Sequence, residues 1–85
     1  MFVLLVYDID FNCDDGPSRL RKIASICENY GVRVQNSVFE MELNAGKLKE
    51  LKMRLEIVMD RQYDSIKLYK IKNPDLHTVF VIMKK

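Results

Sequence analysis

The order of apolar and polar residues along the chain predicts five strands and two helices. The first strand is an unbroken run of six apolar or aromatic residues, Phe2 to Tyr7. Such a run is too short for a membrane span and is typical of a central strand covered on both faces. The run ends abruptly in Asp8-Ile9-Asp10. Because a carboxylate at the end of a rigid strand can face a ligand, Asp8 is the first candidate for a functional site.

Two stretches show the 3.6-residue period of amphipathic helices. Gly16-Pro17 predicts the start of the first helix, and Gly31 predicts its end as a C′ glycine. Asn44 is a good N-cap for the second helix, which we expect from about Ala45 to Asp60. The apolar stripes consist of Leu20, Ile23, Ala24, Cys27 and Tyr30 in the first helix, and of Leu48, Leu51, Leu55, Val58 and Met59 in the second. The outer face of the first helix is expected to carry Arg19, Arg21 and Lys22.

Residues 32–43 are strand-like but change parity. The apolar residues fall on even positions in Val32-Arg33-Val34 and on odd positions in 39–43 (FEMEL). A change of parity needs a tight reversal or a bulge. We favour two short strands joined at Asn36-Ser37, with one bulged strand as the alternative.

Two further strands are predicted at residues 64–72 and Val79–Met83, with a turn at Asn73-Pro74-Asp75 between them. The whole order is most economically an α+β, ferredoxin-like βαββαβ sandwich with an additional C-terminal strand. Both helices would cover one face of an antiparallel sheet. A single domain of 85 residues, 48% of them hydrophobic, buries only about 60–65% of its unfolded surface. We therefore expect a second copy to cover the other face in a homodimer.

Charge is divided unevenly along the chain. Residues 1–16 carry four aspartates and no basic residue, a net charge of −4, whereas residues 17–85 carry 14 basic and 8 acidic residues, a net charge of +6. This division suits a cation site beside a polyanion-binding surface, although small domains also segregate charge by accident.

The cysteines and the lone histidine exclude an ordinary zinc site. Cys13 and Cys27 form no CxxC pattern, and His77 lies in the distant turn region. We expect reduced thiols in a cytoplasmic protein. The N-terminus lacks the pattern of a signal peptide and no stretch approaches 18 apolar residues, so no membrane association is expected.

The acidic segment after the first strand allows several interpretations. A calcium loop beginning at Asp8 fails, because Cys13 replaces the glycine at its sixth position and Arg19 the glutamate at its twelfth. An apolar strand followed by Asp-x-Asp also resembles the nucleophile motif of haloacid dehalogenase-like phosphatases, but 85 residues cannot supply the rest of that fold. An RNA-recognition module is disfavoured, because no aromatic RNP-type motif appears.

Four motifs, in order, resemble the CRISPR-associated Cas2 family. They are Tyr7-Asp8-Ile9 and the segments 19–23 (RLRKI), 28–40 (ENYGVRVQNSVFE) and 64–69 (DSIKLY), and the resemblance runs from Phe2 to about Lys72. It implies a ferredoxin-like homodimer that is a partner of the CRISPR integrase in spacer acquisition. It also implies metal-dependent endonuclease activity on RNA or double-stranded DNA. In that family the catalytic metal ligand falls on Asp8, one copy from each protomer, and the nucleic-acid-binding positions fall on Tyr7, Arg19, Arg21, Arg33 and Phe39.

The physical chemistry of such a site is clear. Two aspartates at a symmetry axis repel each other, and a divalent cation between them relieves the repulsion. Oxygen ligands favour Mg²⁺, with Mn²⁺ as the alternative. The ion would polarise a phosphodiester and activate water, while arginines hold the phosphates.

A rival hypothesis is a non-catalytic dimeric adaptor whose basic faces bridge duplex DNA and two integrase dimers. The candidate faces are Lys47, Lys49, Lys52 and Arg54, or Arg19, Arg21 and Lys22. The choice between RNA and DNA, and the path of the C-terminal strand across the dimer, stay open at this point.

Overall fold

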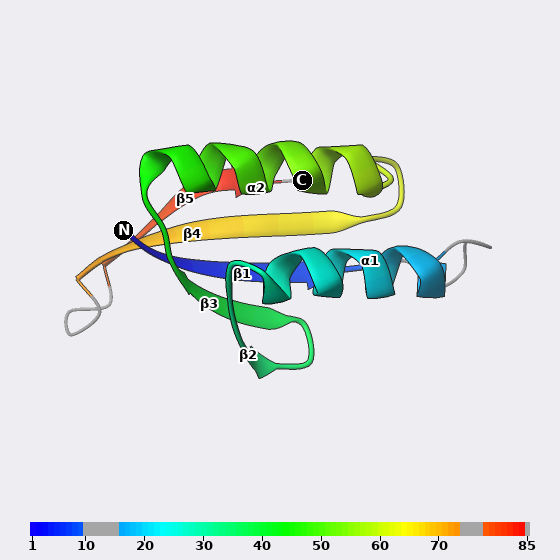
Figure 1. Cartoon of the computed structure of the whole chain (residues 1–85), viewed down its shortest axis with the longest axis horizontal. Coiled ribbons are helices and arrows are strands. Elements are labelled where there is room, and N and C mark those ends of the chain that lie inside the picture. The colour runs from blue at the N-terminus through cyan, green and yellow to red at the C-terminus, as the bar shows by residue number, and fades with distance from the viewer. Residues whose placement is uncertain (10–15, 74–77, 85) are drawn as a thin grey trace.

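The protein is a five-stranded antiparallel sheet with two helices on one face (Figure 1). The computed structural model describes the backbone of residues 1–9, 16–73 and 78–84, and side chains in these ranges as far as Ile71. The strands are β1 (Phe2–Asp8), β2 (Gly31–Gln35), β3 (Val38–Glu42), β4 (Ser65–Asn73) and β5 (Thr78–Lys84), and the helices are α1 (Gly16–Glu28) and α2 (Ala45–Val58). The sheet order β2-β3-β1-β4-β5 confirms the ferredoxin-like βαββαβ arrangement with one further strand.

Strand β1 lies at the centre of the sheet and pairs with β3 on one side and β4 on the other. Val3, Leu5 and Tyr7 are buried against the helices. The alternate residues Phe2, Leu4 and Val6 are only half-buried. Within the single chain only the first face of β1 is covered, because both helices pack on it.

We call the opposite side of the sheet the helix-free face and define it by Leu4, Val6, Val32 and Val38. Strand pairing aligns these residues, since Leu4 and Val32 both pair with Glu40, and Val6 pairs with Val38. Val32 is 68% exposed. This face of the described chain is partly open to solvent, and it carries the exposed Glu40 among these apolar residues.

The hairpin of β2 and β3 confirms the two-strand interpretation of residues 32–43. The strands are joined at Asn36-Ser37, and their register shifts between Arg33 and Gln35. The odd-numbered residues of β3, Phe39 and Met41, enter the core. Strand β3 is internal, whereas β2 is an edge strand. The buried residues of this hairpin are therefore the odd-numbered ones of β3.

Gly31 does not end α1 as predicted. The helix ends at Glu28, and the next two amides donate to the carbonyls of Ile26 and Cys27. Gly31 instead begins β2 opposite Met41. A Cβ at this position would lie 2.3 Å from the backbone oxygen of Glu40, so the glycine permits a close approach of two strands.

Helix α2 begins as predicted. The Asn44 side chain accepts a hydrogen bond from the Lys47 amide at 2.8 Å, which is the geometry of an N-cap. The helix ends at Val58, two residues before the predicted Asp60.

One buried cluster joins the sheet to both helices. It consists of Val3, Leu5, Tyr7, Ile9, Ile23, Cys27, Phe39, Met41, Leu43, Leu51, Leu55, Met59, Ile66 and Leu68.

The last two strands confirm the C-terminal predictions, with β4 extending to Asn73 and β5 covering Val79–Met83. Pro74, Asp75 and His77 lie outside the described residues. Neither of the two described helices is long and apolar enough to traverse a lipid bilayer.

Candidate functional site

A hollow of about 470 Å³ lies at the carboxyl end of β1. Its walls come from β1, α1 and the β2–β3 hairpin, which are far apart in sequence. The lining residues are Tyr7, Asp8, Ile9, Leu20, Arg33, Asn36 and Ser37. The hollow thus brings together three of the six site residues expected from the sequence, namely Tyr7, Asp8 and Arg33.

Asp8 is exposed, although it ends a strand that is paired on both sides. It is the last residue of β1 and pairs with Ser65 of β4. On the other side the preceding amide, that of Tyr7, donates to the Ser37 carbonyl at 3.0 Å. By strand alternation Asp8 belongs to the same side as Leu4 and Val6. Its carboxylate is therefore presented by a rigid strand end at the margin of the helix-free face.

Arg33 is stacked on two aromatic rings. Its Cζ lies 5.3 Å from the centroid of Phe39, and the Phe39 ring stacks on Tyr7 with centroids 6.1 Å apart. A guanidinium over an aromatic face is held by the ring quadrupole. The side chain is 43% exposed, and its nearest acidic partner is Glu28 at 3.8 Å. Arg33 therefore offers a cation to the hollow that also contains Asp8.

Tyr7 supports the hairpin from inside the core. Its hydroxyl donates to the Asn36 carbonyl at 3.0 Å. Burial raises the pKa of the Tyr7 phenol, and the positive charge of Arg33 opposes this effect only in part. The phenol therefore stays protonated at neutral pH and serves as a donor to the turn.

Phe39 and Tyr7 do not occupy the position expected of nucleic-acid contacts. Phe39 is 0% exposed and Tyr7 is 3% exposed. A ring buried in this way cannot stack on a base. The resemblance implied direct contact, whereas the structure gives both rings a supporting role beneath Arg33.

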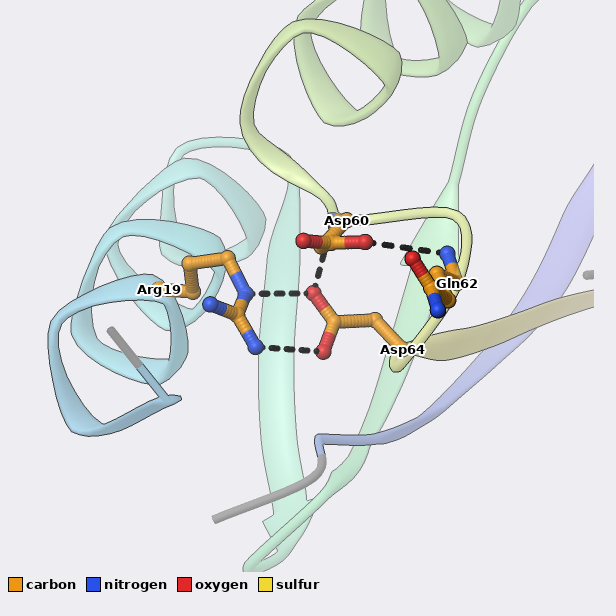
Figure 2. A network of polar contacts seen from close by, with 4 residues as sticks. All are labelled: Arg19, Asp60, Gln62 and Asp64. Carbon is orange, nitrogen blue, oxygen red and sulfur yellow. Dashed lines mark hydrogen bonds and ion pairs between the residues drawn. The ribbon is translucent and has the colours of Figure 1, made fainter. Parts of the chain in front are cut away.

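Arg19 is also displaced from its expected place on the outer face of α1. It is 8% exposed, and its Nε and one terminal nitrogen donate to Asp64 at 2.7 and 3.0 Å. Figure 2 shows this pair, together with the amide of Asp60 that donates to Asp64 at 2.8 Å. The Gln62 amide donates in turn to the Asp60 carboxylate at 2.9 Å (Figure 2).

Asp64 was missed as a site residue by the sequence reasoning. The signal that could have found it is a carboxylate placed directly before the apolar positions of β4, Ile66 and Leu68. A carboxylate at such a position must either face solvent or be paired. Its partner, Arg19, was not considered because helical periodicity alone assigned that residue to solvent.

Arg21 lies away from the hollow that contains Asp8. It is exposed, and it lines a second hollow between the two helices with Lys22 and Val58. The structure thus separates the two arginines of the RLRKI motif. Arg19 is directed inward, and Arg21 outward.

Within residues 1–9, 16–73 and 78–84, no three acidic, histidine or cysteine side chains gather closely enough to hold a metal ion. Asp8 is the acidic residue that lines the hollow in this part of the chain, and Mg²⁺ is usually held by one or two carboxylates together with waters and substrate phosphates. A second copy of Asp8 across a two-fold axis would double the oxygen ligands. Asp10, Asp14 and Asp15 lie outside the described residues.

The fold and this site together define a class of small ferredoxin-like proteins with an acidic strand end beside a stacked arginine. Residues 1–79 match the family model described as CRISPR associated protein Cas2. The chain belongs to the CRISPR-associated Cas2 family, which confirms the resemblance of the four motifs.

Relatives and solved structures support this assignment. A protein of Moorella thermoacetica named CRISPR-associated endoribonuclease Cas2 1 is 39% identical over 74 residues, 87% of this chain and 77% of the relative. One of Halalkalibacterium halodurans named CRISPR-associated endonuclease Cas2 is 44% identical over 73 residues, 86% of this chain and 76% of the relative. The crystal structure of Streptococcus pyogenes Cas2 at pH 6.5 superposes with a TM-score of 0.81 and 39% identity, and covers 92% of this chain and 95% of that one.

Proposed function

We propose that the protein is a metal-dependent endonuclease that acts on RNA or double-stranded DNA during spacer acquisition in the cytoplasm. The observation that carries the proposal is the exposed Asp8 carboxylate on a rigid strand end, in the same hollow as the Arg33 guanidinium. The names endoribonuclease and endonuclease of the two relatives support the same class of reaction.

The helix-free face supports a homodimer. Leu4 and Val6 are half-buried and Val32 is 68% exposed, so apolar side chains face solvent in a single chain, with the exposed Glu40 between Leu4 and Val32. Apolar patches of this kind are usually covered by a partner. Asp8 lies at the margin of this face, so a second copy packed against it would bring two Asp8 carboxylates toward a common axis.

The chemistry then follows from the two side chains. A bound Mg²⁺, or Mn²⁺, would polarise the scissile phosphodiester and lower the pKa of water. The paired Asp8 carboxylates would hold the ion, and Arg33 would bind a phosphate oxygen through charge-assisted hydrogen bonds. Tyr7 and Phe39 restrict the position of Arg33 before the substrate binds. The Arg33 side chain therefore loses less conformational entropy on binding.

The decisive test replaces Asp8 by Asn, which keeps the shape and removes the charge. Because Asp8 is exposed, the variant should unfold at the wild-type temperature. Its Mg²⁺-dependent cleavage of RNA and of duplex DNA should fall by at least about 100-fold, since even residues that only orient metal ligands contribute 10- to 100-fold. Glu56→Gln is the matched control, because Glu56 is an exposed carboxylate on α2, and it should cleave like the wild type. Full activity of Asp8→Asn that chelator abolishes would contradict the proposal.

A second candidate function is the dimeric adaptor that bridges DNA and the CRISPR integrase. The observation that favours it is the exposure of basic side chains on both helices, Arg21 and Lys22 on α1 and Lys47, Lys49 and Arg54 on α2. On α2 this charge is partly offset, because Lys47 and Arg54 lie 4.0 and 3.6 Å from the Glu50 carboxylate. Spacer integration that persists with Asp8→Asn but fails with Arg21→Ala/Lys22→Ala would identify the adaptor role as the physiological one.

A further inference from the structure

We propose that Arg19 and Asp64 form a clip that positions Asp8 for metal binding. The inference rests on the proposed function and assigns a role to two residues that do not line the hollow. The two side chains lie 45 positions apart in sequence and join the first turns of α1 to the start of β4 (Figure 2). Neither is among the described residues that line the hollow, so both would act through the backbone that they hold.

The clip is buried and geometrically specific. The Asp64 side chain is 0% exposed and that of Arg19 is 10% exposed. The two parallel hydrogen bonds of 2.7 and 3.0 Å form the bidentate arrangement that fixes both the distance and the orientation of a guanidinium and a carboxylate. A lysine in place of Arg19 could not reproduce this fork.

Asp64 also closes the turn between α2 and β4. One of its carboxylate oxygens accepts the Asp60 amide, and its own amide donates to the Asp60 carbonyl, both at 2.8 Å. The clip therefore joins three segments: the beginning of α1, the turn that follows α2 at Asp60, and the beginning of β4. A shift of any one segment changes the positions of the other two.

These segments flank Asp8. Ser65 follows Asp64 directly and is the β4 partner of Asp8. On the α1 side Leu20 follows Arg19 and lines the same hollow as Asp8. Since a displacement of about 1 Å at a reacting group can cost 100-fold in rate, a clip that fixes the strand partner of a metal ligand should be visible in metal affinity.

The experiment must separate positioning from folding, because a buried charge left without its partner destabilises a protein by itself. Asp64→Asn and Arg19→Lys break the clip, whereas the double variant Arg19→Met/Asp64→Leu removes both charges and keeps side-chain volume. Apolar replacement of a buried ion pair is often neutral for stability. The double variant should therefore avoid the cost of an unpaired Arg19 charge, while it still loses the acceptor of the Asp60 amide.

Metal binding is measured with Mn²⁺ alone by electron paramagnetic resonance, and Mn²⁺-dependent cleavage is titrated in parallel at a temperature where every variant is folded. We expect both clip-breaking variants and the double variant to need at least about 10-fold more Mn²⁺ for half-saturation, the size of effect usual for residues that orient metal ligands. Leu51→Ala is the matched control for lost stability, because Leu51 is a fully buried core residue on α2. It should unfold earlier and bind Mn²⁺ like the wild type.

The outcomes are distinct. Wild-type Mn²⁺ affinity in the folded double variant and in Arg19→Lys would overturn the clip proposal, while Asp8→Asn in the same assay would still report on the nuclease. A Mn²⁺ shift in Leu51→Ala as large as that in Asp64→Asn would also overturn it, since stability alone would then explain the effect. Failure of the wild type to bind Mn²⁺ would overturn both proposals.

Discussion

Replacement of Phe39 tests whether its ring supports the fold or contacts nucleic acid. The ring is fully buried, stacks on Tyr7 and carries the Arg33 guanidinium on its face. Phe39→Leu keeps most of the apolar volume and removes both ring interactions. We expect this variant to fold with lower stability and to bind nucleic acid more weakly only through a less ordered Arg33.

The expected magnitude follows from the contacts. A volume-conserving core substitution costs less than about 1.5 kcal/mol, and loss of an aromatic pair adds about 0.5–1.5 kcal/mol. The sum for Phe39→Leu is about 2 kcal/mol, or a fall in melting temperature of roughly 8–16 °C for a domain of this size. Phe39→Ala should cost about 3–5 kcal/mol. Against a total of about 4–13 kcal/mol for 85 residues, the leucine variant is the one that can be measured safely.

Stability is measured by urea unfolding at one fixed protein concentration, because a dimer makes apparent stability depend on concentration. Affinity for a fluorescent duplex is measured for Phe39→Leu, Arg33→Ala and the double variant. If the ring acts through Arg33, then Phe39→Leu should weaken binding very little in the Arg33→Ala background. A Phe39→Leu variant with wild-type stability and an additive loss of affinity would refute the reasoning, because the ring would then contact the ligand directly.

Two further predictions concern α2 and the core. Asn44→Ala removes the acceptor for the Lys47 amide and should lower the free energy of unfolding by about 1 kcal/mol, whereas Asn44→Asp should leave thermal unfolding unchanged within about 2 °C. Burial raises the pKa of the Cys27 thiol from 9.0 to about 12. The stability that the protonated thiol contributes is therefore complete below pH 9 and is lost as the pH rises toward 12. Over this range the free energy of unfolding should fall by up to about 1.4 kcal/mol per pH unit. Urea unfolding between pH 8 and 11 should therefore show a gentler decline for Cys27→Ala than for the wild type, and equal slopes would contradict the assignment.

Local patterns predicted most of the backbone, because each element carries its own signals. The apolar run from Phe2 to Tyr7, the turn at Asn36-Ser37 and the N-cap at Asn44 all describe interactions between near neighbours in sequence. Asp8 could be singled out for the same reason, since a carboxylate that ends an apolar strand is visible without any knowledge of its surroundings.

The residues that sequence reasoning misplaced are those whose environment comes from distant segments. Helical periodicity assigned Arg19 to solvent, because the periodicity does not include a carboxylate 45 residues away. Gly31 was interpreted as a helix terminator, although the reason for glycine is the Glu40 carbonyl of the neighbouring strand. Phe39 was carried over as a contact residue because a motif records which residue is present and not how deeply it is buried.

The central place of β1 has a consequence for biosynthesis. Strand β1 is synthesised before both of its partners, β3 and β4, and β4 begins only at Ser65. Sheets built from such distant pairings assemble slowly and leave apolar segments open to aggregation in the meantime. A nascent chain that stops before Ser65 leaves β1 at an unpaired sheet edge, so such truncated translation products should be insoluble or depend on chaperones.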